Sequence, residues 1–260
     1  MNKILKYSVF GVLVAGFCVG MHFLERATLS GRPSLTCTDL EVQFKDSLEF
    51  VSGDDVRECI SNTYGPFLGK QLDSIALGRI EEILEAQSAV RKSEAWVTDD
   101  GTLHIAITQR APVVRFQNGE SGFYVDDRGF IFPLHPRYTA DVPLVEGAIP
   151  VEFTDGFKGE ARTEAERLWI REMIDFTGFV NGSGRWNGFF STVRVRENGD
   201  LELRPAEGEE TFIFGPPHSI AEKFDRVDRY YSYILPAKGN CYRTINIKYK
   251  NQIICRTKDM

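Results

Sequence analysis

Histidine and acidic side chains would form any metal site in this chain, and their spacing does not favour one. The four histidines are not spaced with one another, with cysteine or with acids in the way that metal ligands are. They lie at positions His22, His104, His135 and His218. The sequence therefore predicts no metal site and no cofactor.

Four short motifs resemble phosphate-binding or catalytic patterns but lack an essential part. Gly65–Lys70 (GPFLGK) is one residue short between its glycines and lacks the Ser/Thr that would hold magnesium. Ser183 lies between glycines, yet no preceding strand presents it as a nucleophile. Asp99–Asp100 and Asp126–Asp127 are expected at hairpin tips, where turn formation explains them better than paired acid–base catalysis. We interpret the chain as a protein that is not an enzyme and has no small-molecule substrate.

The cysteines indicate a possible disulfide framework. Cys18 lies in an apolar N-terminal stretch, and no CxxC pair is present. The other four fall into an early and a late pair, which fits two disulfides in an oxidising compartment or, equally, four reduced core cysteines. The possible disulfide residues are Cys37, Cys59, Cys241 and Cys255.

The N-terminus favours a membrane anchor. Ile4–Leu24 is apolar except near its ends, and as a helix it would extend about 31 Å, close to the hydrocarbon thickness of a bilayer. A secretory signal peptide is the alternative, but its apolar core is usually shorter. We therefore expect a cytoplasmic stub at residues 1–3, a transmembrane helix at 4–24 and a linker at 25–36. A net charge of −6 gives no support for nucleic-acid binding.

Apolar periodicity predicts a compact unit over residues 37–108. Alternation predicts a strand at Leu40–Phe44, and Ser52 begins a helix as its N-cap. Leu77, Ile80 and Leu84 then form one apolar stripe of a second helix. Two further strands follow, so the order is strand, helix, helix, strand, strand.

Residues 109–260 are predicted to form a mostly antiparallel β domain with two helices. The helices are expected at Glu160–Thr177 and Ile220–Ile234, with Pro236 ending the second. The whole chain is therefore assigned to the α+β class. The last strand, Ile253–Arg256, has two interpretations: an edge strand that pairs with another chain, or a strand that fills the core or pairs internally.

The order of these elements, followed by Gln109-Arg110-Ala111-Pro112, resembles the FtsQ/DivIB family of cell-division proteins. Further points of resemblance are Tyr124–Gly129 (YVDDRG), Val142–Gly147, Gly215 before a helix, and the late strand Ile245–Tyr249. The resemblance implies a POTRA domain (β-α-α-β-β) at 37–108, followed by the β domain at 109–260. Gln109 replaces the family's usual acid, so a salt bridge made by that acid is absent.

The resemblance also implies a function: a non-enzymatic, single-pass scaffold of the divisome in the bacterial inner membrane, with its C-terminal domain in the periplasm at the division septum. Its implied partners are FtsB-like and FtsL-like bitopic proteins, bound by strand addition at the last strand. The residues carried over are Tyr249, Asn251, Ile253, Cys255 and Thr257, and Ile253→Asp is expected to abolish binding without disturbing the fold. The alternative is a POTRA-bearing component of envelope assembly or transport.

Overall fold

The computed structural model describes residues 16, 17, 21, 35–154 and 156–257. Of the expected membrane segment Ile4–Leu24 it describes Gly16, Phe17 and Met21, which are helical. The stub, the rest of that segment and the linker as far as residue 34 lie outside the described residues. Within the ranges that are described, no helix combines the length and the apolar character needed to cross a bilayer.

The chain folds into two compact units. Unit 1 contains the described residues up to Gln43, together with Gly53–Leu84 and Ser93–Ile107. Unit 2 contains Phe44–Ser52, Glu85–Lys92 and the described residues from Thr108 onward.

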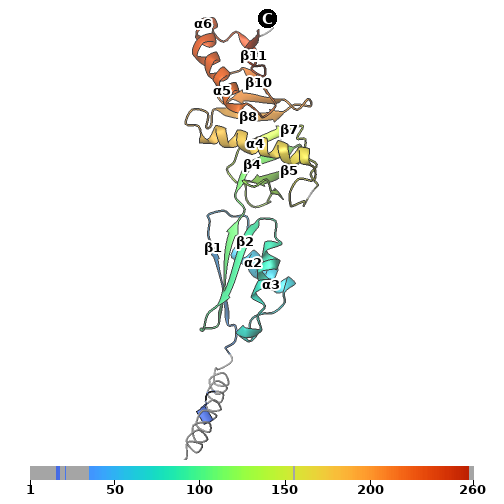
Figure 1. The fold of residues 1–260 in the computed structure, drawn as a ribbon, viewed down its shortest axis with the longest axis vertical. Coiled ribbons are helices and arrows are strands. Elements are labelled where there is room, and N and C mark those ends of the chain that lie inside the picture. Colours follow the sequence, from blue (N-terminus) through green and yellow to red (C-terminus); the bar gives the residue numbers. More distant parts are fainter. Residues whose placement is uncertain (1–15, 18–20, 22–34, 155, 258–260) are drawn as a thin grey trace, which may run out of the picture. The chain divides into compact units, whose positions relative to one another are not determined.

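Unit 1 is a three-stranded sheet with two α-helices, in the sheet order β1-β3-β2 (Figure 1). Ile60, Ile80 and Leu103 are fully buried in its core, so the apolar stripes predicted for the helices do face the sheet. The predicted order of strands and helices is confirmed. Some of its elements have terminal residues that are assigned to unit 2. The elements are β1 (Asp39–Phe44), α2 (Gly53–Thr63), the 3-10 turn η1 (Leu72–Ser74), α3 (Leu77–Glu85), β2 (Val90–Val97) and β3 (Thr102–Gln109).

Unit 2 is built on one nine-stranded sheet in the order β12-β11-β10-β9-β8-β7-β4-β5-β6. Five of the eight neighbouring strand pairs are antiparallel and three are parallel, so the sheet is mostly antiparallel, as predicted. The strands are β4 (Pro112–Asn118), β5 (Ser121–Asp126), β6 (Ile131–Pro133), β7 (Leu144–Gly147), β8 (Phe190–Val195), β9 (Leu201–Pro205), β10 (Thr211–Gly215), β11 (Tyr242–Asn246) and β12 (Ile254–Thr257).

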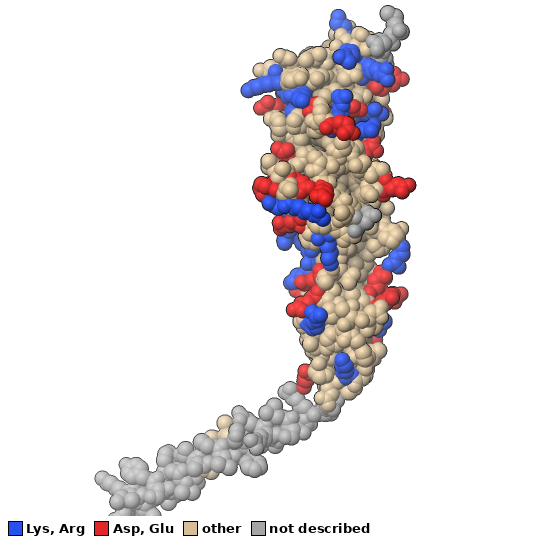
Figure 2. Space-filling model, turned by 90° about the vertical axis from the view of Figure 1, so that its right-hand side faces the viewer, with Lys and Arg blue, Asp and Glu red and all other residues tan. Residues whose placement is uncertain are grey.

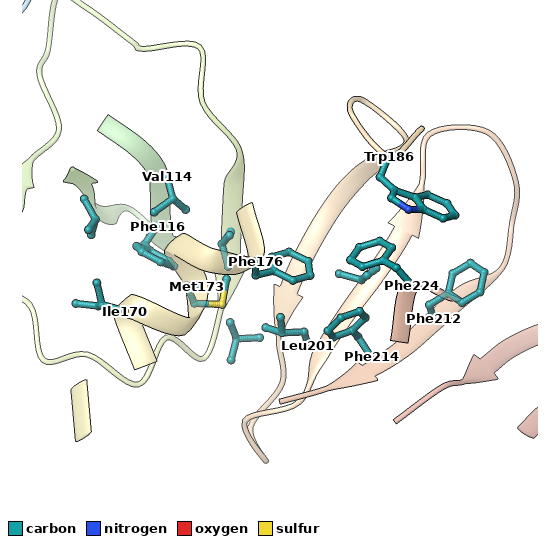
Figure 3. Packing of buried hydrophobic residues seen from close by; sticks show 14 of the residues in the cluster. Val114, Phe116, Ile170, Met173, Phe176, Trp186, Leu201, Phe212, Phe214 and Phe224 are labelled. Carbon is teal, nitrogen blue, oxygen red and sulfur yellow. The ribbon is translucent and has the colours of Figure 1, made fainter. Parts of the chain in front are cut away.

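Two helical segments pack against one face of this sheet. The first is α4 (Glu164–Gly182) and the second begins with α5 (Ile220–Arg229). Phe176 of α4 meets Phe214 of β10 edge to face at 5.3 Å, and Phe224 of α5 lies 5.4 Å from the same Phe214 ring (Figure 3). This aromatic core holds the C-terminal strands in place.

The N-terminus of α4 is fixed by a capping box. The Thr163 hydroxyl accepts a hydrogen bond from the Glu166 amide at 3.2 Å, and Glu166 Oε2 accepts one from the Thr163 amide at 2.8 Å. Glu166 Oε1 also accepts a bond from the Glu152 amide at 2.7 Å. These amides, first that of Glu152 and then that of Thr163, lower the pKa of the Glu166 carboxyl, although burial opposes them.

The second helical segment does not stop at Pro236, contrary to the prediction. A π-helical turn, η2 (Tyr230–Ile234), follows α5, and α6 (Leu235–Lys238) continues beyond it. Pro236 lies in the first turn of α6, where the amide hydrogen that proline lacks is not needed. The π-helical turn changes the hydrogen-bond register just before that point.

The Gln109-Arg110-Ala111-Pro112 stretch runs from the last residue of β3 to the first residue of β4 and carries a polar cluster within unit 2. The Gln109 side chain donates to Asp46 Oδ1 at 2.8 Å and to the Leu48 carbonyl, and accepts from the Val51 amide at 2.9 Å. Arg110 donates to Asp126 Oδ2 at 3.1 Å. Gln109 is thus a buried residue whose amide oxygen and nitrogen both have partners.

Candidate partner-binding edge

Among the described strands, β12 is the last of the nine-stranded sheet and pairs only with β11. The pairing is antiparallel, with Ile245 opposite Cys255 and Asn246 opposite Ile254, and its register shifts between Tyr242 and Thr244. In the part of the chain that the structure describes, no strand lies on the other side of β12. Backbone N–H and C=O groups on that side are available to an added strand.

The turn between β11 and β12 is fixed by polar contacts from Lys248. Its ammonium group lies 2.8 and 3.0 Å from the two carboxylate oxygens of Asp200, a buried residue, and its amide donates to Asn246 Oδ1 at 3.0 Å. The contact with Asp200 raises the pKa of Lys248. A Cβ at Gly215, where φ is 81°, would lie 2.6 Å from Lys248 Cγ, so glycine is needed there.

Two cations on α5 bind carbonyl groups beside strands β10 and β11. The Lys223 ammonium donates to the Pro216 carbonyl and lies 4.8 Å above the Phe214 ring. Arg226 Nε donates to the Ile247 carbonyl at 2.9 Å. Burial, with the neighbouring Arg226 charge, lowers the pKa of Lys223 to about 8. These contacts join α5 to the strands that support the edge, although burial makes the charged form of Lys223 unfavourable there.

The two faces of β12 differ. Ile253, just before the strand, and Cys255 pack against the core of unit 2. Ile254 is 49% exposed and, like Arg256, lines the groove on the opposite face. Ile254 is therefore the large apolar side chain that β12 presents to solvent.

The residues predicted from sequence occupy different environments along this hairpin. Tyr249 is half exposed in the turn, and Asn251 occupies the left-handed region at φ 58°. Thr257 is exposed at the end of β12, opposite Tyr242. Ile253 and Cys255 contact the core, so the expected effect of Ile253→Asp on binding cannot be separated from an effect on packing. The sequence interpretation overlooked Ile254 and Arg256. Their exposure depends on which side chains of β12 lie on the sheet face away from the core.

An open polar groove of about 910 Å³ lies on the face of the sheet opposite the helices. Glu202 pairs with Arg204 at 3.2 Å, whereas Arg243 and Arg256 make no ion pair with any described residue. Basic side chains also gather at the end of unit 2 where β11 lies (Figures 1 and 2). The edge therefore combines an unpaired strand side, one exposed isoleucine and two arginines that make no ion pair within the described part of the chain.

Two tyrosines of the π-helical turn lie beneath this edge. Tyr231 donates its hydroxyl to Glu210 at 2.6 Å. Burial and this hydrogen bond raise the pKa of Tyr231. Tyr230 is fully buried with no hydrogen-bond partner for its hydroxyl among the described residues, and burial raises its pKa to about 12. The turn thus supports the edge through packing and one short hydrogen bond.

Two of the motifs that resembled catalytic patterns, those of Asp126 and Ser183, make turn contacts. Asp126 is fully buried and accepts hydrogen bonds from the Arg128 and Phe130 amides, both at 2.9 Å, as a hairpin residue does. Ser183 Oγ accepts from the Trp186 amide at 3.3 Å just after α4. His104 stacks on Trp96 with ring centroids 5.2 Å apart. Among the described residues, no group of three or more His, Cys, Asp or Glu side chains could hold a metal ion.

In this structure no disulfide joins any two of the four described cysteines. Cys37 is buried in unit 1 and carries a free thiol, while Cys59 is half-buried on α2. Cys241 is exposed before β11, and Cys255 is half-buried on β12. Burial raises the pKa of the Cys37 and Cys255 thiols, which disfavours their reactive thiolate forms.

Comparison with known protein families assigns most of the chain. Residues 111–256 match a family described as FtsQ/DivIB, C-terminal related. Residues 35–108 match a POTRA-like domain. The curated proteins that were compared include none that matches this chain.

Proposed function

The chain belongs to the FtsQ/DivIB, C-terminal related family, and we propose on this basis that it is a non-enzymatic scaffold of the bacterial cell-division machinery. The family match covers more than half of the chain, and the POTRA-like match precedes it directly. Both units carry extensive cores, and the polar motifs described above are occupied by turn and cap contacts. This arrangement suits a protein that positions others.

In this proposal Ile4–Leu24 anchors the chain in the inner membrane, and the part from residue 37 onward lies in the periplasm at the division septum. The support is the apolar composition of that segment, which is long enough for one membrane span.

The proposed partners are FtsB-like and FtsL-like bitopic proteins, which would add a strand to β12. One observation carries this proposal: in the described part of the chain, β12 ends the sheet with an unpaired side and exposes Ile254. An added strand would take its affinity from main-chain hydrogen bonds and its specificity from side-chain pockets. Arg243 and Arg256 favour an acidic segment in the partner, because both lack an ion pair within the described chain.

The sharpest test compares two exposed residues. Ile254→Asp places a carboxylate on the edge, while Leu168→Asp does the same on α4, where the leucine is 58% exposed. Full-length variants would be crosslinked in growing cells and purified, and the bound proteins identified by mass spectrometry. We expect the two small bitopic proteins to be recovered with wild type and Leu168→Asp, and to be lost with Ile254→Asp.

Circular dichroism of each purified variant separates loss of binding from loss of fold. Unchanged recovery with a natively folded Ile254→Asp variant would refute the β12 site. Recovery of outer-membrane barrels or secreted substrates with the wild-type chain would instead favour an envelope-assembly or transport role, which shares the POTRA-like domain.

A further inference from the structure

One exposed loop of unit 1 combines a fixed backbone with an outward apolar side chain. In the segment Gly65–Lys70, Phe67 is buried whereas Leu68 is 52% exposed. Gly65 and Gly69 have φ values of 93° and 80°, which other residues rarely adopt. The Lys70 ammonium lies 4.9 Å above the Tyr64 ring. Leu68 is thus held on a defined turn and extends into solvent.

This loop is hydrogen-bonded to the segment through which the chain enters unit 1. The Gly69 amide donates to the Cys37 carbonyl at 2.7 Å, and the Cys37 amide donates to the Lys70 carbonyl at 2.8 Å. The Leu72 amide donates to the carbonyl of Leu35 at 2.9 Å. Leu35 is itself 39% exposed, so a second large apolar side chain lies in the paired segment.

The length of chain before Leu35 limits its distance from the membrane. If Ile4–Leu24 is the anchor proposed above, ten residues, 25–34, separate it from Leu35. Fully extended, they span at most about 35 Å, and as a flexible coil about 17 Å. The Gly65–Lys70 loop, paired beside Leu35, is therefore tethered close to the bilayer surface.

We propose that this loop contacts the lipid bilayer, with Leu68 inserted at the boundary between headgroups and acyl chains. The inference rests on the proposed membrane anchor. Apolar side chains at such a boundary gain free energy by leaving water, and the tether removes most of the entropic cost of reaching the surface.

The charges near the loop indicate a contact that does not depend on anionic lipids. The Thr38 amide donates to the Gly101 carbonyl at 2.8 Å, which places the Asp99–Asp100 turn beside the same segment. Asp73 is also exposed just after the loop. These carboxylates offset Lys70, so zwitterionic lipid is sufficient and added salt has little effect.

Tryptophan quenching in reconstituted full-length protein tests this contact. Leu68→Trp and the control Leu168→Trp each add one tryptophan at an exposed leucine, and wild type gives the background of the three native tryptophans. The vesicles contain phosphatidylcholine, with or without bromine on the upper acyl chain. In brominated vesicles, the fluorescence of the tryptophan introduced at position 68 should fall by about half or more relative to unbrominated vesicles. The reason is that an inserted side chain reaches the depth of the bromine atoms. The emission added at position 168 should be unchanged.

Flotation of the vesicles distinguishes a failure of the loop contact from a failure of the proposed membrane anchor. Protein that floats with its lipid but shows no quenching at position 68 would refute the loop contact and leave the anchor intact. Protein that does not float would refute both. Hydrogen exchange of wild type provides a check without substitution: amides of residues 65–70 should exchange more slowly in vesicles than in detergent, and equal rates would also count against the contact.

Discussion

Restoring the family's usual acid at position 109 should destabilise this chain. Gln109→Glu removes the amide donor that now bonds Asp46 Oδ1 at 2.8 Å and the Leu48 carbonyl. It also places a second carboxyl group against Asp46 in a buried site. The local partners of Gln109 therefore require an amide, although the family resemblance favours an acid.

The magnitude follows from two contributions to the free energy of unfolding. Loss of the bond to the Leu48 carbonyl costs about 1 kcal/mol. Repulsion from Asp46 raises the pKa of the carboxyl group introduced at position 109. Each pKa unit above the ordinary value of about 4.3 destabilises the folded state by about 1.4 kcal/mol. Because the group becomes protonated once its pKa exceeds the pH, this electrostatic cost at pH 7 cannot exceed about 3.7 kcal/mol. The total at pH 7 is about 2–5 kcal/mol. The folded pKa is raised, so the electrostatic part is absent below about pH 4.3 and grows as pH increases from there.

Urea unfolding of the full-length chain in mild detergent, followed by tryptophan fluorescence, measures this change. Gln252→Glu is the control, because Gln252 is exposed in the β11–β12 turn. In an Asp46→Asn background the cost of Gln109→Glu should fall to about 1–2 kcal/mol, because the like charge is gone. A cost at pH 7 below about 0.5 kcal/mol, or one unaffected by Asp46→Asn, would refute the reasoning.

Three further predictions concern the helices and the edge. Glu166→Gln should cost about 1 kcal/mol at pH 7. Because the folded pKa of Glu166 is lowered, that difference should be present above its ordinary value of about 4.5 and disappear as pH falls below it; an equal cost at pH 3 and pH 7 would contradict this. Lys223→Met should stabilise unit 2 by about 1–3 kcal/mol at pH 7, since the folded pKa of about 8 disfavours the charge. This difference in stability from wild type should shrink as pH rises from 8 to 10.5. Thermal unfolding at pH 7 and pH 10 measures it, and an equal difference at both pH values would contradict the reasoning. Gly215→Ala should cost at least about 1 kcal/mol through its positive φ and the contact with Lys248, which urea unfolding measures; a neutral effect would show that Lys248 can move aside without loss.

Local periodicity predicts most of the helices and strands but not which strands pair with one another. The stripe from Ile220 to Ile234 predicted a helix because every third or fourth residue faces the core. The parallel pairing of β10 with β11 could not be predicted, because it follows a helical crossover whose path depends on the whole core. At Gln109 the sequence alone shows only a departure from the family pattern, because its partner Asp46 lies 63 residues away.

At the candidate site, too, the sequence pattern predicts the strand but not which of its side chains are exposed. Position 253 and position 254 are both isoleucine, so alternation of apolar and polar residues cannot say which one faces outward. The pairing of Asn246 with Ile254 and the packing of the core decide it. The same reasoning applies to Arg256. It lies two residues after Ile254, so it is on the same face of the strand, and the sequence alone does not say which face that is.

The edge position of β12 has a mechanical consequence for anything paired with it. Antiparallel ladder bonds run perpendicular to the strands. A partner strand pulled along its own direction would load all of these bonds together and slide only when they fail as a group. The same strand lifted away from one end would lose them one at a time. Attachment at β12 would therefore resist tension along the strand and yield readily to peeling, so the direction in which a partner pulls would govern how long it stays bound.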